Sequence, residues 1–299
     1  MKTGADNSNF VKVFSHTQGV LAGNKGKKMK IRIRFRKYGV MKFIGHLDIM
    51  RYFQKAMRRA DIDIAYSEGF SPHQIMSFAA PLGVGIISDG EYLDIEVHST
   101  RPSRESIDAL NAVMVEGVEV TDYVLLPDKA KKSMAIVAAA EYDVWYKISA
   151  GDLSCRKDSC KNRSAAGPND PAESTPSCER LTPEEITAGI HDYYDCQDEI
   201  LITKQTKKSE RVVDVRPHIF KFSLFTGEDE SGAETYGFHL FLSAGSEENI
   251  KPELVIEDFC RFLGKPWNPY DFQIRRNDVY ARTEKGFVPL NAFGEVISE

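Results

Sequence analysis

Residues 30–96 read KIRIRFRKYGVMKFIGHLDIMRYFQKAMRRADIDIAYSEGFSPHQIMSFAAPLGVGIISDGEYLDIE. Residues 30–36 alternate between basic and apolar side chains, so that Ile31, Ile33 and Phe35 share one face. A period of two in a segment rich in β-branched residues predicts a strand with one buried face. This strand therefore presents a basic face on its other side.

A basic amphipathic helix is predicted to follow, from about His46 to Ala60. At about 100° per residue, Met50, Phe53, Met57 and Ala60 cluster on one side of this helix. The other side carries Arg51, Lys55, Arg58 and Arg59. We expect the apolar stripe to face the core and the basic stripe to face outward.

The charge of this region differs sharply from that of the whole chain. Residues 30–59 contain ten Lys and Arg against one acid, Asp48, for a charge of +9. The chain as a whole has a net charge of −5, which leaves −14 for the remainder. A charge asymmetry of this kind indicates what the chain binds rather than how it folds.

The first half of the chain predicts a strand–helix–strand–strand–helix–strand order. After the basic helix we expect strands at 64–66, 75–78 and 92–97, a helix at 103–114 with Ser103 as N-cap, and a closing strand at 117–126. This order is typical of the ferredoxin-like split βαβ arrangement, whose antiparallel sheet has two helices on one face.

The second half repeats that order loosely. Thr182-Pro183-Glu184-Glu185 is a strong helix start. We expect strands at 141–148, 200–203, 213–225, 236–242 and 272–280, and a further helix at 252–263. Residues 151–180 are rich in Ser, Pro, Asn, Asp and Gly without apolar periodicity, which predicts a disordered insertion.

The predicted fold class is therefore α+β, with two ferredoxin-like units built on antiparallel sheets. The predicted boundaries are a disordered tail at 1–28, a first unit at 29–127, a second unit at 138–282 with the flexible insertion 151–180, and a C-terminal tail at 283–299.

The cysteines and the hydropathy bear on compartment. The five cysteines are Cys155, Cys160, Cys178, Cys196 and Cys260. An odd number without an export signal favours free thiols in a reducing cytoplasm. No C-x-x-C or H-x-x-x-H spacing accompanies them, so we predict no metal site. No apolar run is long enough to span a membrane.

Two histidines and an acid are candidate reactive groups. His46 and Asp48 open the basic helix, whose N-terminus offers unpaired N–H groups to an anion. Gly69-Phe70-Ser71-Pro72-His73 forms a predicted turn, in which Gly69 permits positive φ and His73 points toward His46. The alternative is that both histidines are ordinary helix-start and turn residues.

The basic residues are candidates for binding a phosphate backbone. We place His46, Arg51, Lys55, Arg58, Arg59, Gly69 and His73 on a first binding face, which Arg216 and Lys251 extend. Tyr38, Phe43, Tyr52 and Phe70 are available to stack on unpaired bases. The alternatives are a solvated helix face or a docking surface for an acidic protein.

The run from Phe43 to Glu96, together with VDVRPHI and SAGSEENIKPELV further on, resembles the radical SAM-linked protein family of bacteria, a domain of unknown function. Members of that family are typically encoded beside, or fused behind, a radical SAM protein. The resemblance implies a partner subunit with no established reaction. S-adenosylmethionine and an iron–sulfur cluster belong to the partner, because this chain lacks the CxxxCxxC motif.

The leading functional hypothesis is thus a cytoplasmic, non-catalytic accessory protein of a radical SAM enzyme. Its basic face binds RNA, either tRNA or rRNA, or else the partner's substrate. The first alternative is an enzyme that uses His46, Asp48 and His73. The second is a pure protein-docking module.

Overall fold

A computed structural model describes residues 21–22, 27–147, 180–205, 210–245 and 248–298. The chain is α+β, with strands predominating over a few helices. It divides into two compact units, of which the first comprises Met1–Ala139 with Asp278–Glu299 and the second Ala140–Asn277. The tail expected at 1–28 and the insertion expected at 151–180 lie almost entirely outside the described residues.

The first unit contains the elements expected from residues 30–126, and several more. In chain order they are β1 (Leu21–Ala22), β2 (Met29–Lys37), η1 (Gly39–Phe43), α1 (His46–Arg59), β3 (Met76–Phe78), β4 (Ile87–Val97), β5 (Ser99–Thr100), α2 (Ser103–Asn111), β6 (Val118–Leu126), α3 (Ser133–Ile136), β13 (Gly286–Pro289), η5 (Leu290–Phe293) and β14 (Glu295–Val296).

Strand β2 lies in the middle of the sheet of this unit. It pairs antiparallel with β4 on one side and with β6 on the other, so Ile33 lies opposite both Leu93 and Tyr123. Strand β3 pairs antiparallel with β4, and β14 pairs antiparallel with β6. The strand order is therefore β3-β4-β2-β6-β14.

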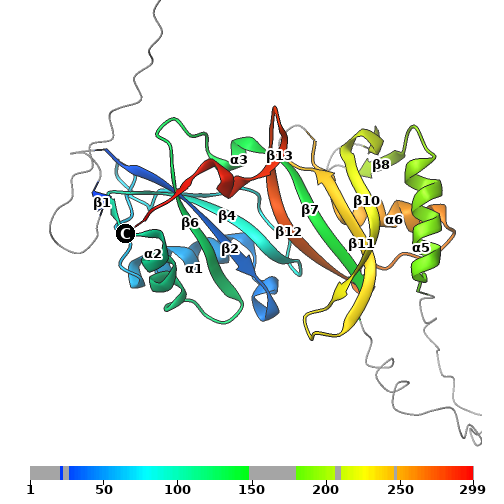
Figure 1. Cartoon of the computed structure of the whole chain (residues 1–299), viewed down its shortest axis with the longest axis horizontal. Coiled ribbons are helices and arrows are strands. Elements are labelled where there is room, and N and C mark those ends of the chain that lie inside the picture. Colours follow the sequence, from blue (N-terminus) through cyan, green and yellow to red (C-terminus); the bar gives the residue numbers. More distant parts are fainter. Residues whose placement is uncertain (1–20, 23–26, 148–179, 206–209, 246–247, 299) are drawn as a thin grey trace, which may run out of the picture. The chain divides into compact units, whose positions relative to one another are not determined.

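The core of the first unit lies between this sheet and helices α1 and α2 (Figure 1). Ile31, Ile33 and Phe35 of β2 are buried there, as the alternation predicts. Phe35 contacts Phe53 of α1 at a ring separation of 4.7 Å, and both pack near Phe78 of β3. Burying aromatic side chains of this size dominates the stabilisation of a small core.

The second unit has its own core. Its elements are β7 (Val137–Tyr146), α5 (Pro183–Ile190), the π-helical η2 (His191–Asp195), β8 (Leu201–Gln205), β9 (Glu210–Asp214), η3 (Arg216–His218), β10 (Ile219–Glu228), β11 (Glu234–Ser243), α6 (Pro252–Phe262), η4 (Pro269–Asp271) and β12 (Phe272–Thr283), which continues into the first unit. The strand order is β10-β11-β7-β12, and β8 pairs with β9 separately. Phe222, Phe238 and Phe259 form an aromatic cluster in this core.

The segment expected to be a C-terminal tail is instead part of the first unit. Strand β13 pairs with β12, and β14 pairs with β6. Ile297 is buried, and its backbone N–H donates to Ser103 Oγ at 2.8 Å. Apolar and polar residues in 283–299 follow neither the period of a strand nor that of a helix. The sequence therefore predicted a tail.

Ser103, predicted to be the N-cap of α2, is instead the first residue of this helix. Its hydroxyl donates to the carbonyl oxygen of Tyr123 in β6 while accepting from Ile297. Pro102 occupies the N-cap position and provides no side-chain cap. The hydroxyl joins three chain segments, and that role cannot be read from local spacing.

Two strand predictions also differ from the structure. Residues 64–66 form isolated bridges, Ile64 with Val97 and Tyr66 with Gln74, rather than a strand. The single strand expected at 213–225 is divided by η3 into β9 and β10, because Pro217 has no N–H to donate and interrupts the extended chain. The helix start expected at residues 182–185 is confirmed, and it is also a capping box, in which the Thr182 hydroxyl and the Glu185 carboxylate each accept from the other's backbone N–H.

Candidate functional site

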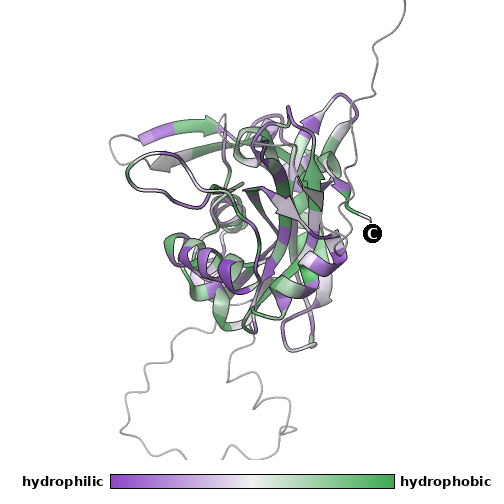
Figure 2. Cartoon of the chain, turned by 90° about the vertical axis from the view of Figure 1, so that its left-hand side faces the viewer, coloured by the Kyte–Doolittle hydropathy of each residue, from purple (hydrophilic) through white to green (hydrophobic). Residues whose placement is uncertain are grey.

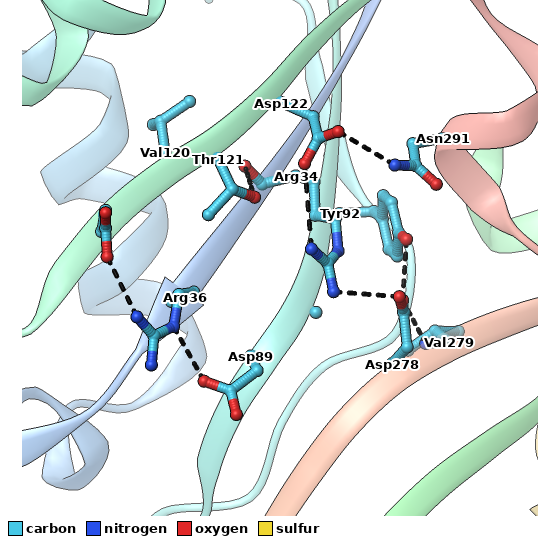
Figure 3. A network of polar contacts seen from close by, with 12 residues as sticks. Arg34, Arg36, Asp89, Tyr92, Val120, Thr121, Asp122, Asp278, Val279 and Asn291 are labelled. Atoms are coloured by element: carbon cyan, nitrogen blue, oxygen red, sulfur yellow. Dashed lines mark hydrogen bonds and ion pairs between the residues drawn. The ribbon is translucent and has the colours of Figure 1, made fainter.

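Arg34 and Arg36 of β2 are paired with acids of other strands in the sheet (Figure 3). Arg36 binds Asp89 at 2.8 Å and Glu119 at 3.2 Å. Arg32, which is 1% exposed, makes two hydrogen bonds to the carboxylate of Asp94, at 2.7 and 3.0 Å. A fork-to-fork arginine–carboxylate pair of this kind is among the stronger polar contacts in proteins.

Arg34 occupies the centre of this network. Its Nη2 lies 3.0 Å from Asp278 Oδ2, while the Tyr92 hydroxyl donates to Asp278 Oδ1 at 2.7 Å. Burial, followed by the negative charge of Asp278, raises the pKa of Tyr92 above its ordinary value. Asp122 adds a longer ion pair to Arg34, at 3.8 Å, and accepts a hydrogen bond from Asn291.

The excess positive charge of residues 30–59 is therefore paired with acids on β2 but exposed on α1. On β2 it is neutralised inside the first unit by Asp89, Asp94, Glu119, Asp122 and Asp278. Those arginines stabilise the sheet and do not form a free cationic surface. On α1 the situation is different.

The outer face of α1 carries four exposed cations, which are Arg51, Lys55, Arg58 and Arg59. Lys55 and Arg59 have no hydrogen-bond or ion-pair partner among the described residues. Arg51 makes an exposed ion pair with Asp48 at 3.3 Å, a contact of little energetic weight. The opposite face buries Ile49, Phe53, Ala56 and Met57. In Figure 2, where the left-hand side of Figure 1 faces the viewer, the helix ribbons carry alternating hydrophilic and hydrophobic bands.

A turn between residues 66 and 74 lies beside this helix face. Gly69 has a φ of +113°, which a side chain other than hydrogen would strain. Phe70, which follows, is fully exposed. Gln74 ties the turn to α1, because its Nε2 donates to the carbonyl oxygen of Gln54 at 3.1 Å. The turn that carries this exposed aromatic ring is therefore attached to α1.

His46 and His73, predicted to share a site, have separate surroundings. The His46 ring packs edge-on against Phe78, with ring centroids 5.2 Å apart. His73 Nδ1 forms a hydrogen bond of 2.9 Å with Ser67 Oγ within its own turn. Asp48 is exposed and paired with Arg51. Among the described residues these three side chains have no contact in common, so no observation favours the acid–base hypothesis.

A small apolar cluster lies near the start of α1. Its members are Val40, Phe43, Leu47 and Val84, which are 78%, 62%, 61% and 62% exposed. The loop that contains Val84 is held to η1 by a hydrogen bond of 2.8 Å from Gly85 N–H to the Lys42 carbonyl. The sequence analysis identified only Phe43 of this group. The density of apolar residues in Val40–Leu47 was a signal that could have found Val40 and Leu47, whereas Val84 is brought to the group only by the fold.

Arg216 and Lys251 belong to the second unit. Arg216 lies over the ring of Tyr194 at 4.0 Å, and its Nε donates to the Gln197 carbonyl at 3.2 Å. This stacking gives Arg216 a structural role. Lys251 is exposed at the N-cap position of α6.

A polar cluster in the second unit escaped the sequence analysis. His239 of β11 forms a hydrogen bond of 2.8 Å with Asp143 of β7, and Asn277 of β12 donates to the other oxygen of Asp143 at 2.8 Å. His239 Nε2 lies 3.3 Å from Glu141. The hydrogen bond to Asp143 and the contact with Glu141 raise the pKa of His239 to about 9, against the opposing effect of burial. Three strands distant in sequence form this cluster, so no local motif reveals it.

The family described as "uncharacterized protein conserved in bacteria (DUF2344)" matches residues 30–252. The chain belongs to this family. The DUF2344 match includes β2, the whole of α1, the 66–74 turn, Arg216 and Lys251.

Comparison with other proteins adds little about this DUF2344 member. The crystal structure of an unknown protein from Galdieria sulphuraria is similar at 10% identity, covering 84% of this chain and 98% of that chain with a TM-score of 0.20. No curated protein matches the chain. Within the described residues, none of the helices has the length and apolar character needed to cross a membrane.

Proposed function

We propose that the first unit binds single-stranded RNA across the outer face of α1 and the 66–74 turn, as an accessory protein of a radical SAM enzyme. The observation that carries this proposal is the division of charge. The three arginines of β2 are paired with acids, whereas Arg51, Lys55, Arg58 and Arg59 are exposed on one helix face.

Electrostatics supplies the affinity in this proposal. Each phosphate neutralised by a Lys or Arg releases condensed counterions, so the binding constant falls steeply with salt. A helix face with four cations over fourteen residues suits the repeating charge of an RNA backbone. The acidic remainder of the chain repels RNA elsewhere and favours this face.

Stacking supplies preference for unpaired bases. Bases in single strands stack on exposed aromatic side chains without sequence specificity. Phe70 and Phe43 are both exposed, whereas Tyr52 accepts a hydrogen bond from Val115 N–H and Tyr38 lies beneath Arg36. Phe70 is the better placed of the two, since its turn is tied to α1.

The accessory role is supported by the resemblance of residues 43–96 to the radical SAM-linked family. We further infer that each unit is ferredoxin-like. The support is the element order β2-α1-β3-β4-α2-β6 in the first unit and β7-α5-β10-β11-α6-β12 in the second. In this reading the partner supplies the chemistry, and this chain supplies the binding surface.

The test is fluorescence anisotropy with a labelled single-stranded RNA over a series of salt concentrations. We expect Arg51/Arg58/Arg59→Ala to lower the magnitude of the slope of log K against log salt by about 2, since each lost contact in a single strand contributes about 0.7. The matched control is Lys129/Lys131/Lys132→Ala, which removes three exposed cations elsewhere in the same unit.

Two results would overturn the proposal. One is the absence of RNA binding at low salt. The other is an equal loss in the control variant, since that would make the effect one of net charge rather than of α1.

A second candidate function is docking of a protein partner, which the exposed cluster Val40, Phe43, Leu47 and Val84 favours. Exposed apolar side chains grouped in this way are typical of interaction sites. We expect Val40→Ser/Leu47→Ser, which leaves the aromatic residues in place, to abolish co-purification of a radical SAM protein expressed with the chain while leaving RNA binding unchanged. Co-purification that survives this double substitution would exclude the cluster as the docking site.

A further inference from the structure

An irregular helical turn in the second unit brings together three different metal-binding side chains. Helix α5 ends at Ile190 and continues as the π-helical turn η2. Donor atoms of His191, Asp192 and Cys196 lie within 4.8 Å of one another, and all three residues are exposed. We propose that this group binds a Zn²⁺-like transition-metal ion, independently of the function proposed for the first unit.

The π-turn is what creates the arrangement. In an α-helix, residues five apart point about 140° away from one another around the axis. Here the Cys196 N–H donates to the His191 carbonyl at 3.0 Å, which is the i→i+5 hydrogen bond of a π-turn. This extra residue in the turn places Cys196 beside His191. Turns of this kind are rare and occur frequently at functional sites.

The distances already fit a metal site. Cys196 Sγ lies 3.6 Å from His191 Nε2. With Zn–S and Zn–N bonds of about 2.3 and 2.05 Å, a tetrahedral zinc ion separates sulfur from nitrogen by about 3.5 Å. The sulfur and nitrogen can therefore bind one ion with little rearrangement.

The other imidazole nitrogen faces an acid. His191 Nδ1 lies 3.6 Å from Asp195 Oδ2. A histidine that binds a metal commonly donates its second N–H to a carboxylate, which orients the ring and fixes its tautomer. Nε2 is thus the expected ligand atom, and Asp195 is a positioning residue.

The chemistry of the donors selects the ion. Cysteine thiolate with imidazole favours zinc and similar metals, whereas Mg²⁺ and Ca²⁺ prefer oxygen ligands. The charges of one thiolate and one carboxylate, from Cys196 and Asp192, balance a divalent ion. Three protein ligands leave a fourth position open, which zinc sites fill with water or a ligand. His191 and Asp195 also line a groove of about 860 Å³ beside β10.

Cobalt is a suitable probe, because Co²⁺ replaces zinc and its bond to a thiolate gives a charge-transfer absorption. The experiment uses the full chain with Cys155, Cys160 and Cys178 replaced by Ser, so that only Cys196 and Cys260 remain. We expect one equivalent of Co²⁺ to produce the band and Zn²⁺ to displace it. Mg²⁺ in excess should leave the band unchanged.

Single substitutions in this triple-serine chain test which residues bind the ion. Cys196→Ser should abolish the charge-transfer band, and His191→Ala should weaken Co²⁺ binding at least tenfold. Asp195→Asn should weaken binding about tenfold while keeping the band, as expected for a positioning carboxylate. Cys260→Ser is the control, because Cys260 is buried in α6. Circular dichroism checks that the fold is retained.

Two outcomes would overturn the assignment. The first is that no charge-transfer band appears in the background variant. The second is that the band persists after Cys196→Ser. Neither outcome depends on RNA binding by the first unit.

Discussion

The carbonyl oxygen of Gln54 accepts a hydrogen bond from Gln74 Nε2 at 3.1 Å, so the 66–74 turn is fixed against α1. The same oxygen accepts a hydrogen bond from Arg58 Nε at 3.3 Å. One backbone acceptor therefore positions both the turn that carries Phe70 and an arginine of the basic face. The turn with the exposed Phe70 ring and the helix with the exposed cations are thus joined in the first unit, and groups of both kinds contribute to binding of single-stranded nucleic acid.

Phe70→Ala is expected to weaken single-stranded RNA binding about 5- to 150-fold, because stacking on one aromatic side chain contributes about 1–3 kcal/mol per base. The ring is fully exposed, so the free energy of unfolding should change by less than about 0.5 kcal/mol. RNA anisotropy and urea unfolding provide the two measurements. Tyr270→Ala, which removes an exposed ring from the second unit, is the matched control. Equal binding by Phe70→Ala and the unmodified chain would contradict the prediction.

Asp278→Ala should destabilise the first unit by about 3 kcal/mol. The substitution removes the acceptor for Arg34, for the Tyr92 hydroxyl and for the Val279 N–H. Loss of Asp278 leaves a largely buried arginine charge with only the longer contact to Asp122, and removing one partner is the costly way to break such a pair. Urea unfolding measures the loss. Asp122→Ala, which removes a longer and more exposed contact to Arg34, should cost less than about 1 kcal/mol. Similar losses in the two variants would show that Asp278 has no special role.

These contacts also show where sequence reasoning succeeds and where it stops. The alternation in residues 30–36 correctly predicts β2 and its buried face, because side chains along a strand point alternately to opposite sides. It cannot predict what the other face meets. Asp278 is 244 residues from Arg34 in the chain, and only the sheet brings them together.

Helix α1 was also predictable from the period of its apolar residues, but the residues that it meets were not. The 3.6-residue period places α1 within one residue of its observed end and correctly leaves Arg51, Lys55, Arg58 and Arg59 outside. It misses Ile49, which is buried in the first turn. The expected approach of His73 to His46 required knowing the path of a turn. That path depends on Ser67 and Gln74, whose hydrogen bonds have no sequence signature.

Protonated His239 should stabilise the second unit in a pH-dependent manner. The pKa of this histidine is raised from 6.5 to about 9, so the folded chain holds its proton more tightly than the unfolded chain. Stability from this group is therefore fully present below about pH 6.5 and is lost as the pH rises through about 9. At about 1.4 kcal/mol per pKa unit this loss has an upper bound of about 3.5 kcal/mol, and solvent screening of the partly exposed ring makes it smaller.

Thermal unfolding between pH 6 and 10 measures this effect, and His239→Gln isolates it. The difference in melting temperature between the unmodified chain and His239→Gln should shrink as the pH rises. Glutamine does not titrate, whereas all other groups are common to both proteins. A difference that stays constant over this range would show that folding does not raise the pKa of His239.

Gly237 is required by the close approach of two strands, and its substitution tests the register of the second sheet. A Cβ at this position of β11 would overlap the carbonyl oxygen of Val144 in β7. Backbone atoms cannot move aside as a flexible side chain does, so we expect Gly237→Ala to cost more than about 3 kcal/mol. Gly232→Ala is the control within the same unit, since Gly232 has a φ of +78° but open space around it. Its cost should be about 1–2 kcal/mol, the strain of the left-handed conformation alone. Urea unfolding ranks the two variants, and a smaller loss for Gly237→Ala than for Gly232→Ala would mean that β11 and β7 are not paired at Val144.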